Sequence, residues 1–427
     1  NERWKVSFEP VHLDFERYKS KTWTLDSYLK RDGYKALKAV FQEKKWTPET
    51  IIEEVKASGL RGRGGAGFPT GTKWSFINKK SSKPIYLCCN ADEGEPGTFK
   101  DKAIMDENPH QIVEGMIIAA YAINCHHCYI YIRGEFQLEI DRVQKAVDEA
   151  YAQGFLGKNI LGSGFNLEMV VHAGAGAYIC GDETALLSSI EGQKGQPKNK
   201  PPFPAVEGLF KCPTIVNNVA SLAAVPYILR KGAKAYAAMG TEKSTGTFVF
   251  SISGHVNKPG TYEVPLGIPF MEFLDKYAGG VTDGNKLKAL IPGGSSTPVL
   301  TAEECLDLKL DYENCAAKKT MLGSGAIVVL AEGTCMVKVA QVLTRFYHHE
   351  SCGQCTPCRE GTGWMEKIID RFEEGKATSD DIDTLYRVQG QIIGNTICPL
   401  GDAAAMPIES IVRKFRDEFE AHVRKGC

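Results

Sequence analysis

The chain lacks the features that would place it in several special classes of protein. It contains no run of about 18 or more apolar residues, so nothing in it predicts a membrane-spanning helix. Its 51 Lys and Arg residues nearly balance 52 Asp and Glu residues, for a net charge of -1, which gives no reason to expect nucleic acid or an anionic membrane surface as a partner. Repeats and low-complexity tracts are absent as well. Function must therefore be inferred from local motifs.

Two further absences concern the cellular compartment. The first 14 residues lack the basic, apolar and small-residue order of a signal peptide. Of the 14 cysteines, all but four that form a motif of their own show no paired spacing that predicts disulfide bonds. Such cysteine usage is typical of a reducing compartment. We therefore expect a soluble chain, without direct membrane insertion, in the cytosol or its organellar equivalent.

The 427 residues exceed what one hydrophobic core usually serves. The first seventy residues look helical, with Thr47 as N-cap and Pro48 as first residue of one helix. From Ile85 onward, short apolar runs alternate with helical stretches, which is typical of an α/β fold with buried strands. The expected strands and helices there are 85–88, 111–123, 129–132, 139–152 and 166–172.

The pattern changes after residue 234. Residues 247–253 alternate apolar and polar side chains, and a turn at 258–260 leads to a possible paired strand at 261–264, which predicts a small α+β module. The final helical segments, 334–349, 360–373, 379–393 and 402–423, predict a four-helix bundle. We expect domains at 1–75, 76–240, 241–330 and 331–427.

Four cysteines form the most specific motif. Cys352, Cys355 and Cys358 have CxxCxxC spacing, and Cys398 lies further along, directly before a proline. Three closely spaced thiolates and a distant fourth suit a [4Fe-4S] cluster. Four thiolates also make structural zinc sites, but these usually come as two CxxC pairs. We predict the cluster, with zinc as the rival.

The run from Cys125 to Cys128 encloses two histidines and has residue types that bind metals. Four consecutive residues rarely surround one ion, however. We therefore interpret these cysteines, like the others outside the motif, as packing residues or free thiols.

A glycine-rich loop at residues 62–71 contains a literal GxGxxG beginning at Gly62. It follows a predicted helix rather than a strand, so it lacks the context of a dinucleotide-binding fingerprint. Glycines still allow a backbone to approach a phosphate or a flat ring closely, with Arg63 and Lys73 as cationic donors. The alternative is a solvated turn.

Polar residues crowd the segment after the apolar run that ends at Cys89. Asn90, Asp92, Glu93 and Glu95 follow directly. In a parallel sheet this is the carboxyl end of a strand, where open α/β sheets bind ligands. These groups could orient ribose or ribityl hydroxyls or lie near a reacting ring; a solvated acidic turn is the alternative.

Two later segments repeat this arrangement. Glycines at 174–181 separate an expected strand at 167–171 from an expected helix at 182–191, whose free amides would point at a ligand. Asn217 and Asn218 follow a short strand, where they could serve a ring edge or a phosphate. Asp182 and Glu183 could instead be ordinary helix-start acids, and the amides buried turn residues.

Taken together and in this order, the motifs resemble the NADH-binding flavoprotein subunit of NADH:quinone oxidoreductase, respiratory complex I, over nearly the whole chain. The resemblance implies FMN, a site for NADH and NAD+ stacked over it, and one [4Fe-4S] cluster. It implies an α/β multidomain fold with a Rossmann-like FMN-binding domain, a ubiquitin-like β-grasp module of the soluble-ligand-binding type, and a C-terminal four-helix bundle carrying the cluster.

The resemblance also assigns residues. It implies an FMN shell of Gly62, Arg63, Gly64, Lys73, Asn90, Asp92, Glu93, Gly181, Asn217 and Asn218. Tyr178, Asp182 and Val216 join the cofactor-binding residues. It implies nucleotide contacts from Gly64, Gly65 and Glu95 to the nicotinamide, from Phe68, Phe76 and Phe203 to the adenine, and from Glu183 and Lys200 to the ribose and phosphates. The family usually has Glu where this chain has Asp182.

The mechanism that this resemblance implies is hydride transfer from NADH to FMN, then single-electron transfer to the cluster and on towards quinone. Hydride transfer needs no acid or base, so Glu95 would tune flavin potential and nucleotide affinity. Because a carboxylate accepts a hydrogen bond from a 2′-hydroxyl but repels a 2′-phosphate, Glu183 predicts a preference for NADH over NADPH.

The implied partners are a small thioredoxin-like [2Fe-2S] subunit and the larger multi-cluster iron-sulfur subunit of complex I. They would hold the chain peripherally, on the cytoplasmic face of the inner membrane or the mitochondrial matrix side. Two alternatives stay open. Diaphorase subunits of NAD-dependent hydrogenases and formate dehydrogenases share this module, although many carry extra ferredoxin-like cysteine clusters that this chain lacks. A non-catalytic cluster-binding scaffold is the other.

Overall fold

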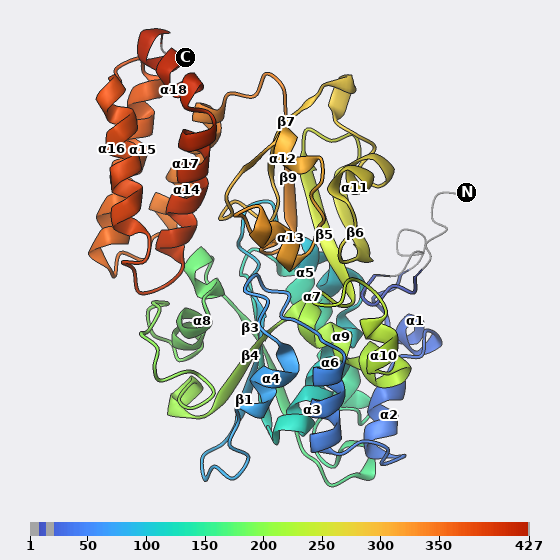
Figure 1. Ribbon diagram of the computed structural model, residues 1–427. Coiled ribbons are helices and arrows are strands. Elements are labelled where there is room, and N and C mark those ends of the chain that lie inside the picture. Colours follow the sequence, from blue (N-terminus) through green and yellow to red (C-terminus); the bar gives the residue numbers. More distant parts are fainter. Residues whose placement is uncertain (1–7, 14–20, 426–427) are drawn as a thin grey trace.

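The computed structural model describes residues 8–13 and 21–425. A sheet region, a β-grasp module and a helical bundle follow one another along the chain (Figure 1). None of the described helices is long and apolar enough to cross a membrane. The described cysteines form no disulfide bonds.

The sheet region is built on four parallel strands in the order β3-β2-β1-β4. The strands are β1 (Tyr86–Ala91), β2 (His127–Ile132), β3 (Glu168–Ala173) and β4 (Thr214–Asn218). Their helices are α5 (Lys100–Glu107), α6 (Pro109–Ile123), α7 (Gln137–Ala152), α8 (Glu183–Ile190), α9 (Val219–Lys231) and α10 (Ala233–Ala237), with 3-10 turns η1 (Ile160–Gly162), η2 (Tyr178–Gly181) and η3 (Leu209–Lys211). The predicted alternation of strands and helices is confirmed.

Alternate residues of β1 serve two different cores, as expected for a strand buried on both faces. Leu87, Cys89 and Ala91 belong to the core that α6 and α9 line. Cys88 belongs to a second core that continues through α8 into the bundle. Apolar side chains therefore connect the sheet to the bundle without a break.

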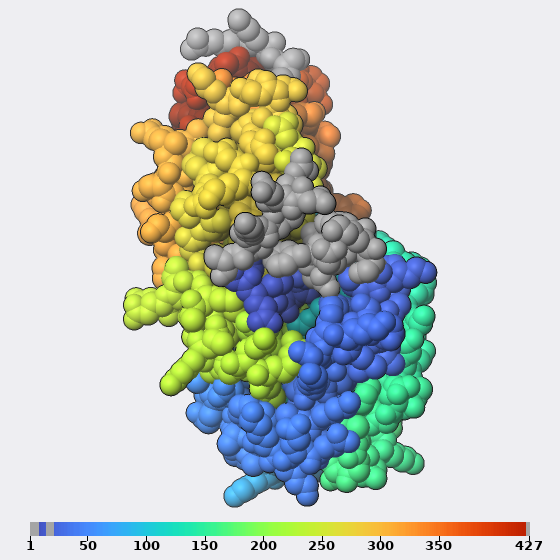
Figure 2. All heavy atoms as spheres, turned by 90° about the vertical axis from the view of Figure 1, so that its right-hand side faces the viewer, coloured from blue at the N-terminus to red at the C-terminus, as the bar shows by residue number. Residues whose placement is uncertain are grey.

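The N-terminal helices α1 (Leu25–Lys30), α2 (Lys35–Phe41), α3 (Pro48–Ala57) and α4 (Thr70–Ser75) share the first core with the sheet. Figure 2 shows this blue segment lying directly on the green and yellow-green sheet region, below the yellow module. Thr47 caps α3 and Pro48 is its first residue, as predicted. Of the rest of the expected helical start, residues 8–13 are not helical, and 1–7 and 14–20 lie outside the described residues.

The β-grasp module is a five-stranded sheet in the order β6-β5-β9-β7-β8. Its strands are β5 (Thr247–Gly254), β6 (Gly260–Pro265), β7 (Leu287–Ile291), β8 (Leu300–Thr301) and β9 (Ala326–Ala331); its helices are α11 (Phe270–Lys276), η4 (Thr282–Gly284), α12 (Ala302–Cys305) and α13 (Tyr312–Ala317). The predicted pairing of β5 with β6 is confirmed as antiparallel, while β5 and β9 are parallel.

The bundle comprises α14 (Met336–Glu350), α15 (Thr356–Glu373), α16 (Ser379–Ile392), α17 (Leu400–Lys414) and α18 (Arg416–Lys425). Four helices were expected, and the prediction of one helix over 402–423 is wrong. The chain leaves helical geometry at Phe415, with φ -127° and ψ 35°, so that α18 turns back across the ends of α14 and α15. Phe419 is fully buried against Phe372, and this apolar contact explains the change of direction.

Candidate functional site

All four parallel strands end at one edge of the sheet, and the polar motifs meet there. Asn90, one residue before the end of β1, lies beside Asn218, the last residue of β4, because the two are register partners. The Asn90 amide donates to the Gly181 carbonyl over 2.9 Å, which brings η2 to the same edge. Gly64 lies here too, since a Cβ atom on it would come within 3.3 Å of Asn218. Residues far apart in sequence thus form one site.

The glycine-rich loop at 62–71 is fixed at this edge from both sides. The backbone amide of Arg63 donates to the Ser221 hydroxyl of α9 over 2.9 Å. Gly65 has φ +126°, and a Cβ atom there would find its nearest neighbour only at 4.0 Å, so the space over this glycine is open to a ligand. Glycine is required because other residues rarely adopt this conformation.

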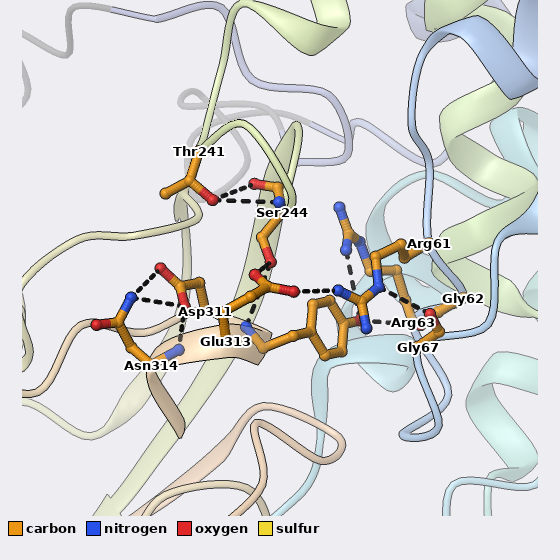
Figure 3. Close-up of polar contacts among 10 residues, drawn as sticks. Arg61, Gly62, Arg63, Gly67, Thr241, Ser244, Asp311, Glu313 and Asn314 are labelled. Atoms are coloured by element: carbon orange, nitrogen blue, oxygen red, sulfur yellow. Dashed lines mark hydrogen bonds and ion pairs between the residues drawn. The ribbon is translucent and has the colours of Figure 1, made fainter. Parts of the chain in front are cut away.

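A clamp from the β-grasp module holds the loop in shape (Figure 3). Arg61 donates through Nε to the Gly67 carbonyl and through Nη1 to Glu313 of α13, over 2.8 and 2.6 Å. The Arg61 guanidinium also lies 3.8 Å from the Tyr312 ring centroid. The Tyr312 hydroxyl in turn donates to the Gly62 carbonyl over 3.0 Å. Both ends of the GxGxxG run are therefore tied to α13.

The guanidinium of Arg63 does not act as the cationic donor that the sequence suggested. It is 1% exposed, and its Nη2 atom donates to the Tyr236 hydroxyl and to the Thr245 and Thr247 carbonyls over 2.9 to 3.1 Å. These three acceptors come from α10 and from the start of the β-grasp module, and they hold the guanidinium inside the protein, while its Nε atom has no hydrogen-bond partner. Its side chain is thus structural, and only its backbone serves the loop.

Asp92 follows β1, and one oxygen of its carboxyl group has no hydrogen-bond partner. Its Oδ2 atom is buried without a hydrogen-bond partner. Burial raises the pKa of this carboxyl to about 7, which nearby Glu135 and Glu350 favour and Arg133 opposes. A buried polar atom without a partner is costly. Asp92 is therefore poised to bond a hydroxyl group of a ligand.

Glu93 instead organises the protein around the site. It accepts hydrogen bonds from the backbone amides of Asp101 and Lys102 over 2.8 and 2.9 Å, at the start of α5. Burial and the neighbouring Asp101 raise its pKa to about 7, although Lys100 opposes the shift. Asp101 accepts from the Asn218 amide over 2.6 Å. The acidic segment and β4 are thereby held together.

Glu95 lies where three parts of the chain meet. Its carboxylate accepts from the Tyr178 hydroxyl over 2.6 Å, and from the Ser296 backbone amide and the Ser295 hydroxyl over 2.7 and 3.2 Å. Ser295 also shares a hydrogen bond of 2.7 Å with Tyr347 of α14. Burial raises the pKa of Tyr178 well above its usual value, so that the hydroxyl stays a donor.

Lys73, Glu183 and Lys200 form a charged triad. The Glu183 carboxylate lies 3.2 Å from Lys73 Nζ and 2.7 Å from Lys200 Nζ. Burial alone would raise the pKa of Glu183, but the two ammonium groups outweigh it, and the pKa is lowered. Lys73 also donates to the Val216 carbonyl over 2.8 Å, which ties the triad to β4. The group carries one net positive charge.

Asp182 caps a helix, whereas its neighbour Glu183 belongs to the charged triad. Its Oδ1 atom accepts from the backbone amides of Thr184 and Ala185 over 2.9 and 3.2 Å, so it is the N-cap of α8. Of the two interpretations of this acid, the structure favours the helix-start role. Asp caps helices well because its short side chain reaches these amides.

The three phenylalanines expected at an adenine are all exposed. Phe68, Phe76 and Phe203 are 47%, 56% and 58% exposed. The rings of Phe68 and Phe76 lie side by side, with centroids 6.0 Å apart. Exposed aromatic rings next to a charged triad suit a ligand with a flat apolar face.

The four cysteines of the motif, hereafter the four-cysteine site, come together at one end of the bundle. Burial raises the pKa of Cys358 to about 11, helped by Cys355 and Cys352. Burial raises the pKa of Cys398 to about 12, with Asp182, Cys352 and Cys358 contributing. Cys352 and Cys358 therefore lie close to Cys398, and so does Asp182, the N-cap of α8.

The spacing of these thiols distinguishes the two metal predictions. A tetrahedral zinc ion with Zn–S bonds of about 2.3 Å holds its sulfur atoms about 3.8 Å apart. No three of the four thiols lie mutually within 4.8 Å in the described structure. The thiols are therefore not gathered as closely as one tetrahedral ion would require.

Sequence reasoning missed several residues of the site. Ser295 and Ser296 follow β7, and Trp74 donates to Asn217 over 2.8 Å. Arg61 gives the loop its clamp. The run from Gly293 to Thr297 had a composition typical of a ligand-facing turn, which was the available signal.

The Cys125 and Cys128 thiols are buried and 3.8 Å apart, in no group with three metal-binding side chains among the described residues.

Comparisons with known proteins match most of the chain. Residues 55–227 match the Nuo51 FMN-binding domain, residues 249–329 the SLBB domain, and residues 338–422 the NADH-ubiquinone oxidoreductase-F iron-sulfur binding region. Among curated relatives, the F subunit of the NADH-quinone oxidoreductase of Mycobacterium tuberculosis (strain ATCC 25618 / H37Rv) is 54% identical over 409 residues, covering 95% of this chain and 92% of the relative. The corresponding protein of Rickettsia bellii (strain OSU 85-389) is 55% identical over 377 residues, covering 88% and 90%.

A solved structure of similar fold is an NAD+-reducing [NiFe]-hydrogenase in the H2-reduced state, with a TM-score of 0.81 and 36% identity. The alignment covers 88% of this chain but 63% of that one. The present chain thus spans less than two thirds of its hydrogenase counterpart.

Proposed function

This chain belongs to the family of the F subunits of NADH-quinone oxidoreductase, and from that premise we propose which of its residues bind FMN, NADH and the [4Fe-4S] cluster. Bound FMN would supply the hydride acceptor for NADH, and a bound [4Fe-4S] cluster would supply the one-electron acceptor. The protein binds, orients and insulates these groups.

The edge of the sheet fits FMN on three counts. The open space over Gly65 accepts a flat ring, and loop amides beside it can approach closely. The orphan Oδ2 of Asp92, directly after β1, offers an acceptor for a ribityl hydroxyl. The Lys73 ammonium supplies positive charge for the phosphate end.

NADH would lie over the flavin, with its adenine against the exposed rings of Phe68, Phe76 and Phe203. Glu183 would accept hydrogen bonds from the adenosine ribose, and Lys200 would contact the phosphates. Glu95 would border the nicotinamide, where its three hydrogen bonds hold a negative charge in place. Alignment of the two rings is the catalytic contribution, since hydride transfer needs no proton.

The observation that carries the proposal is the contact between the sheet edge and the four-cysteine site. Gln196 donates to the Cys352 carbonyl over 3.3 Å, and the Tyr178 amide donates to Glu350 over 3.1 Å. Tyr178 itself bonds Glu95. A group at the sheet edge and a cluster held by the cysteines would therefore be close neighbours.

Cofactor content tests the proposal. We expect the anaerobically purified chain to release FMN and iron in the ratio of one flavin to one four-iron cluster. Cys398→Ser should lose most of the iron and keep the flavin, whereas Cys315→Ser, which changes a buried cysteine of the β-grasp module, should keep both. Full iron content in Cys398→Ser would contradict the cluster assignment.

The chain belongs to a multi-subunit assembly of quinone oxidoreductase or hydrogenase-like type, and we propose the former, with a small thioredoxin-like [2Fe-2S] subunit and a larger multi-cluster subunit as neighbours. Trp364 and Val342 on the bundle are 54% and 60% exposed, which suits subunit contacts. These partners would hold the chain peripherally at the membrane. The domain division at residues 75, 240 and 330 is part of this proposal.

A hydrogenase diaphorase role is the second candidate, favoured by the similarity to the NAD+-reducing enzyme. The chemistry at the site would be the same. Purification of the native assembly distinguishes the two, because only a hydrogenase would contain nickel.

A further inference from the structure

A second group of metal-binding side chains lies far from the sites described so far. Cys335, Glu373 and His422 each place one donor atom within 4.8 Å of the donor atoms of the other two. Among residues 8–13 and 21–425, they are the only group of three metal-binding side chains that does so. Cys335 precedes α14, Glu373 ends α15, and His422 lies on α18. The proposed function uses none of them.

The spacing of the two stronger donors suits one tetrahedral ion. Cys335 Sγ and His422 Nε2 are 3.4 Å apart. A zinc ion with Zn–S of about 2.3 Å and Zn–N of about 2.05 Å would hold them about 3.5 Å apart. In the four-cysteine site, by contrast, no three thiols lie mutually within 4.8 Å.

The imidazole is oriented for metal binding. His422 Nδ1 lies 2.7 Å from the Glu418 carbonyl oxygen. A carbonyl can only accept, so Nδ1 carries the hydrogen and the lone pair of the neutral ring is on Nε2, towards Cys335. Histidine ligands of metals are commonly fixed by such a hydrogen bond from the other ring nitrogen.

Glu373 and Cys335 also have surroundings that favour metal binding. Glu373 Oε1 is buried without a hydrogen-bond partner, while Oε2 lies 3.3 Å from Lys338 Nζ. The Lys338 backbone amide donates to Cys335 Sγ over 3.4 Å, at the N-terminus of α14, where negative charge is favoured. An ion would satisfy the orphan oxygen that the protein leaves unpaired.

We propose that Cys335, Glu373 and His422 bind a zinc ion, with water as the fourth ligand. Sulfur, imidazole and carboxylate together match the preferences of Zn²⁺. Because α14 has 15 residues, this site lies about 22 Å from the four-cysteine site at the other end of the helix. Figure 1 shows α18 at the end of the bundle opposite α8. The ion would fasten α18 across the ends of α14 and α15.

Metal content of the full chain, carrying its FMN and cluster, tests the proposal. After equilibration with Zn²⁺ and desalting, we expect about one tightly bound zinc per wild-type chain. Cys335→Ser, Glu373→Gln and His422→Gln should each lower the retained zinc at least tenfold, with iron and flavin unchanged. Glu374→Gln, which changes an exposed neighbour of Glu373, and His349→Gln, which changes an exposed histidine at the other end of α14, should retain it. Zinc that is absent from the wild type, or equal in all variants, would overturn the proposal.

A second measurement needs no variant and therefore does not depend on variant folding. Cys335 is partly exposed, so iodoacetamide should alkylate it in zinc-free protein. Zinc should slow alkylation at Cys335 at least fivefold, as read by mass spectrometry, and a chelator should restore the rate. An unchanged rate would mean that Cys335 and His422 form a thiol–imidazole hydrogen bond only.

Discussion

Replacing Glu183 by Gln should weaken the discrimination between NADH and NADPH. The carboxylate lies between Lys73 and Lys200, at 3.2 and 2.7 Å. Its removal leaves two ammonium groups that nothing in the triad neutralises. A 2′-phosphate at this position would then meet two positive charges and no negative one.

The size of the effect follows from the charges. Two unit charges about 5 Å apart interact by about 3 kcal/mol at an effective dielectric constant of about 20. The two lysines and the 23% exposure of the Glu183 side chain reduce this repulsion. We expect about 1.4 to 2.8 kcal/mol, which is a rise of roughly 10- to 100-fold in kcat/KM for NADPH. For NADH, a weaker hydrogen bond to the ribose should lower kcat/KM by roughly 3- to 10-fold.

Steady-state reduction of ferricyanide with each nucleotide measures both values on one preparation. Glu207→Gln is the matched control, because Glu207 is an exposed acid on the loop that carries Lys200 and Phe203. Salt should narrow the difference between wild type and Glu183→Gln for NADPH, since it screens the repulsion. An unchanged ratio of the two kcat/KM values in Glu183→Gln would refute this role of the carboxylate.

Three further predictions concern other residues of the site. Glu95→Gln should retain FMN but change KM for NADH or kcat several-fold in the same assay, and unaltered kinetics would exclude the role next to the nicotinamide. In flavin-free protein the pKa of Asp92 in the folded state is raised to about 7. The stability that protonated Asp92 contributes is therefore fully present below its pKa in the unfolded chain, about 3.9, and is lost as pH rises through 7. The melting temperature of Asp92→Asn should therefore rise relative to wild type between about pH 4 and 7, by an amount equivalent to at most about 4 kcal/mol; parallel pH profiles would contradict the shift. Arg61→Ala removes the clamp to Glu313 and should weaken flavin binding roughly tenfold in a fluorescence titration, whereas equal affinity would show that the loop needs no clamp.

The fold could be predicted where local pattern and burial agree. Apolar runs that end in polar residues identified β1 and β4, and alternation identified the hairpin of β5 and β6. The break at Phe415 could not be predicted, because the segment around it has uninterrupted helical character. The burial of Phe419 against Phe372, a residue 47 positions away, decides where α18 turns.

The candidate site, like the fold, could be predicted only in part. Motif residues could be named from sequence, but what each side chain contacts depends on tertiary structure. Arg63 looked like a phosphate ligand because it stands among glycines, yet its side chain is bonded to Tyr236 and to carbonyls near β5. Glu95 gave no sign of its partners, Ser295 and Ser296, which lie 200 and 201 residues away. Only the fold brings such residues together.

The visible absorption spectrum of the anaerobic chain, recorded before and after addition of NADH, tests the central claim most directly. If the site oxidises NADH as argued, bound flavin absorbance should bleach on addition of NADH, above the broad absorbance of an iron-sulfur cluster, and Glu183→Gln should respond to NADPH as well. Flavin that is bound but unaffected by saturating NADH would contradict the account.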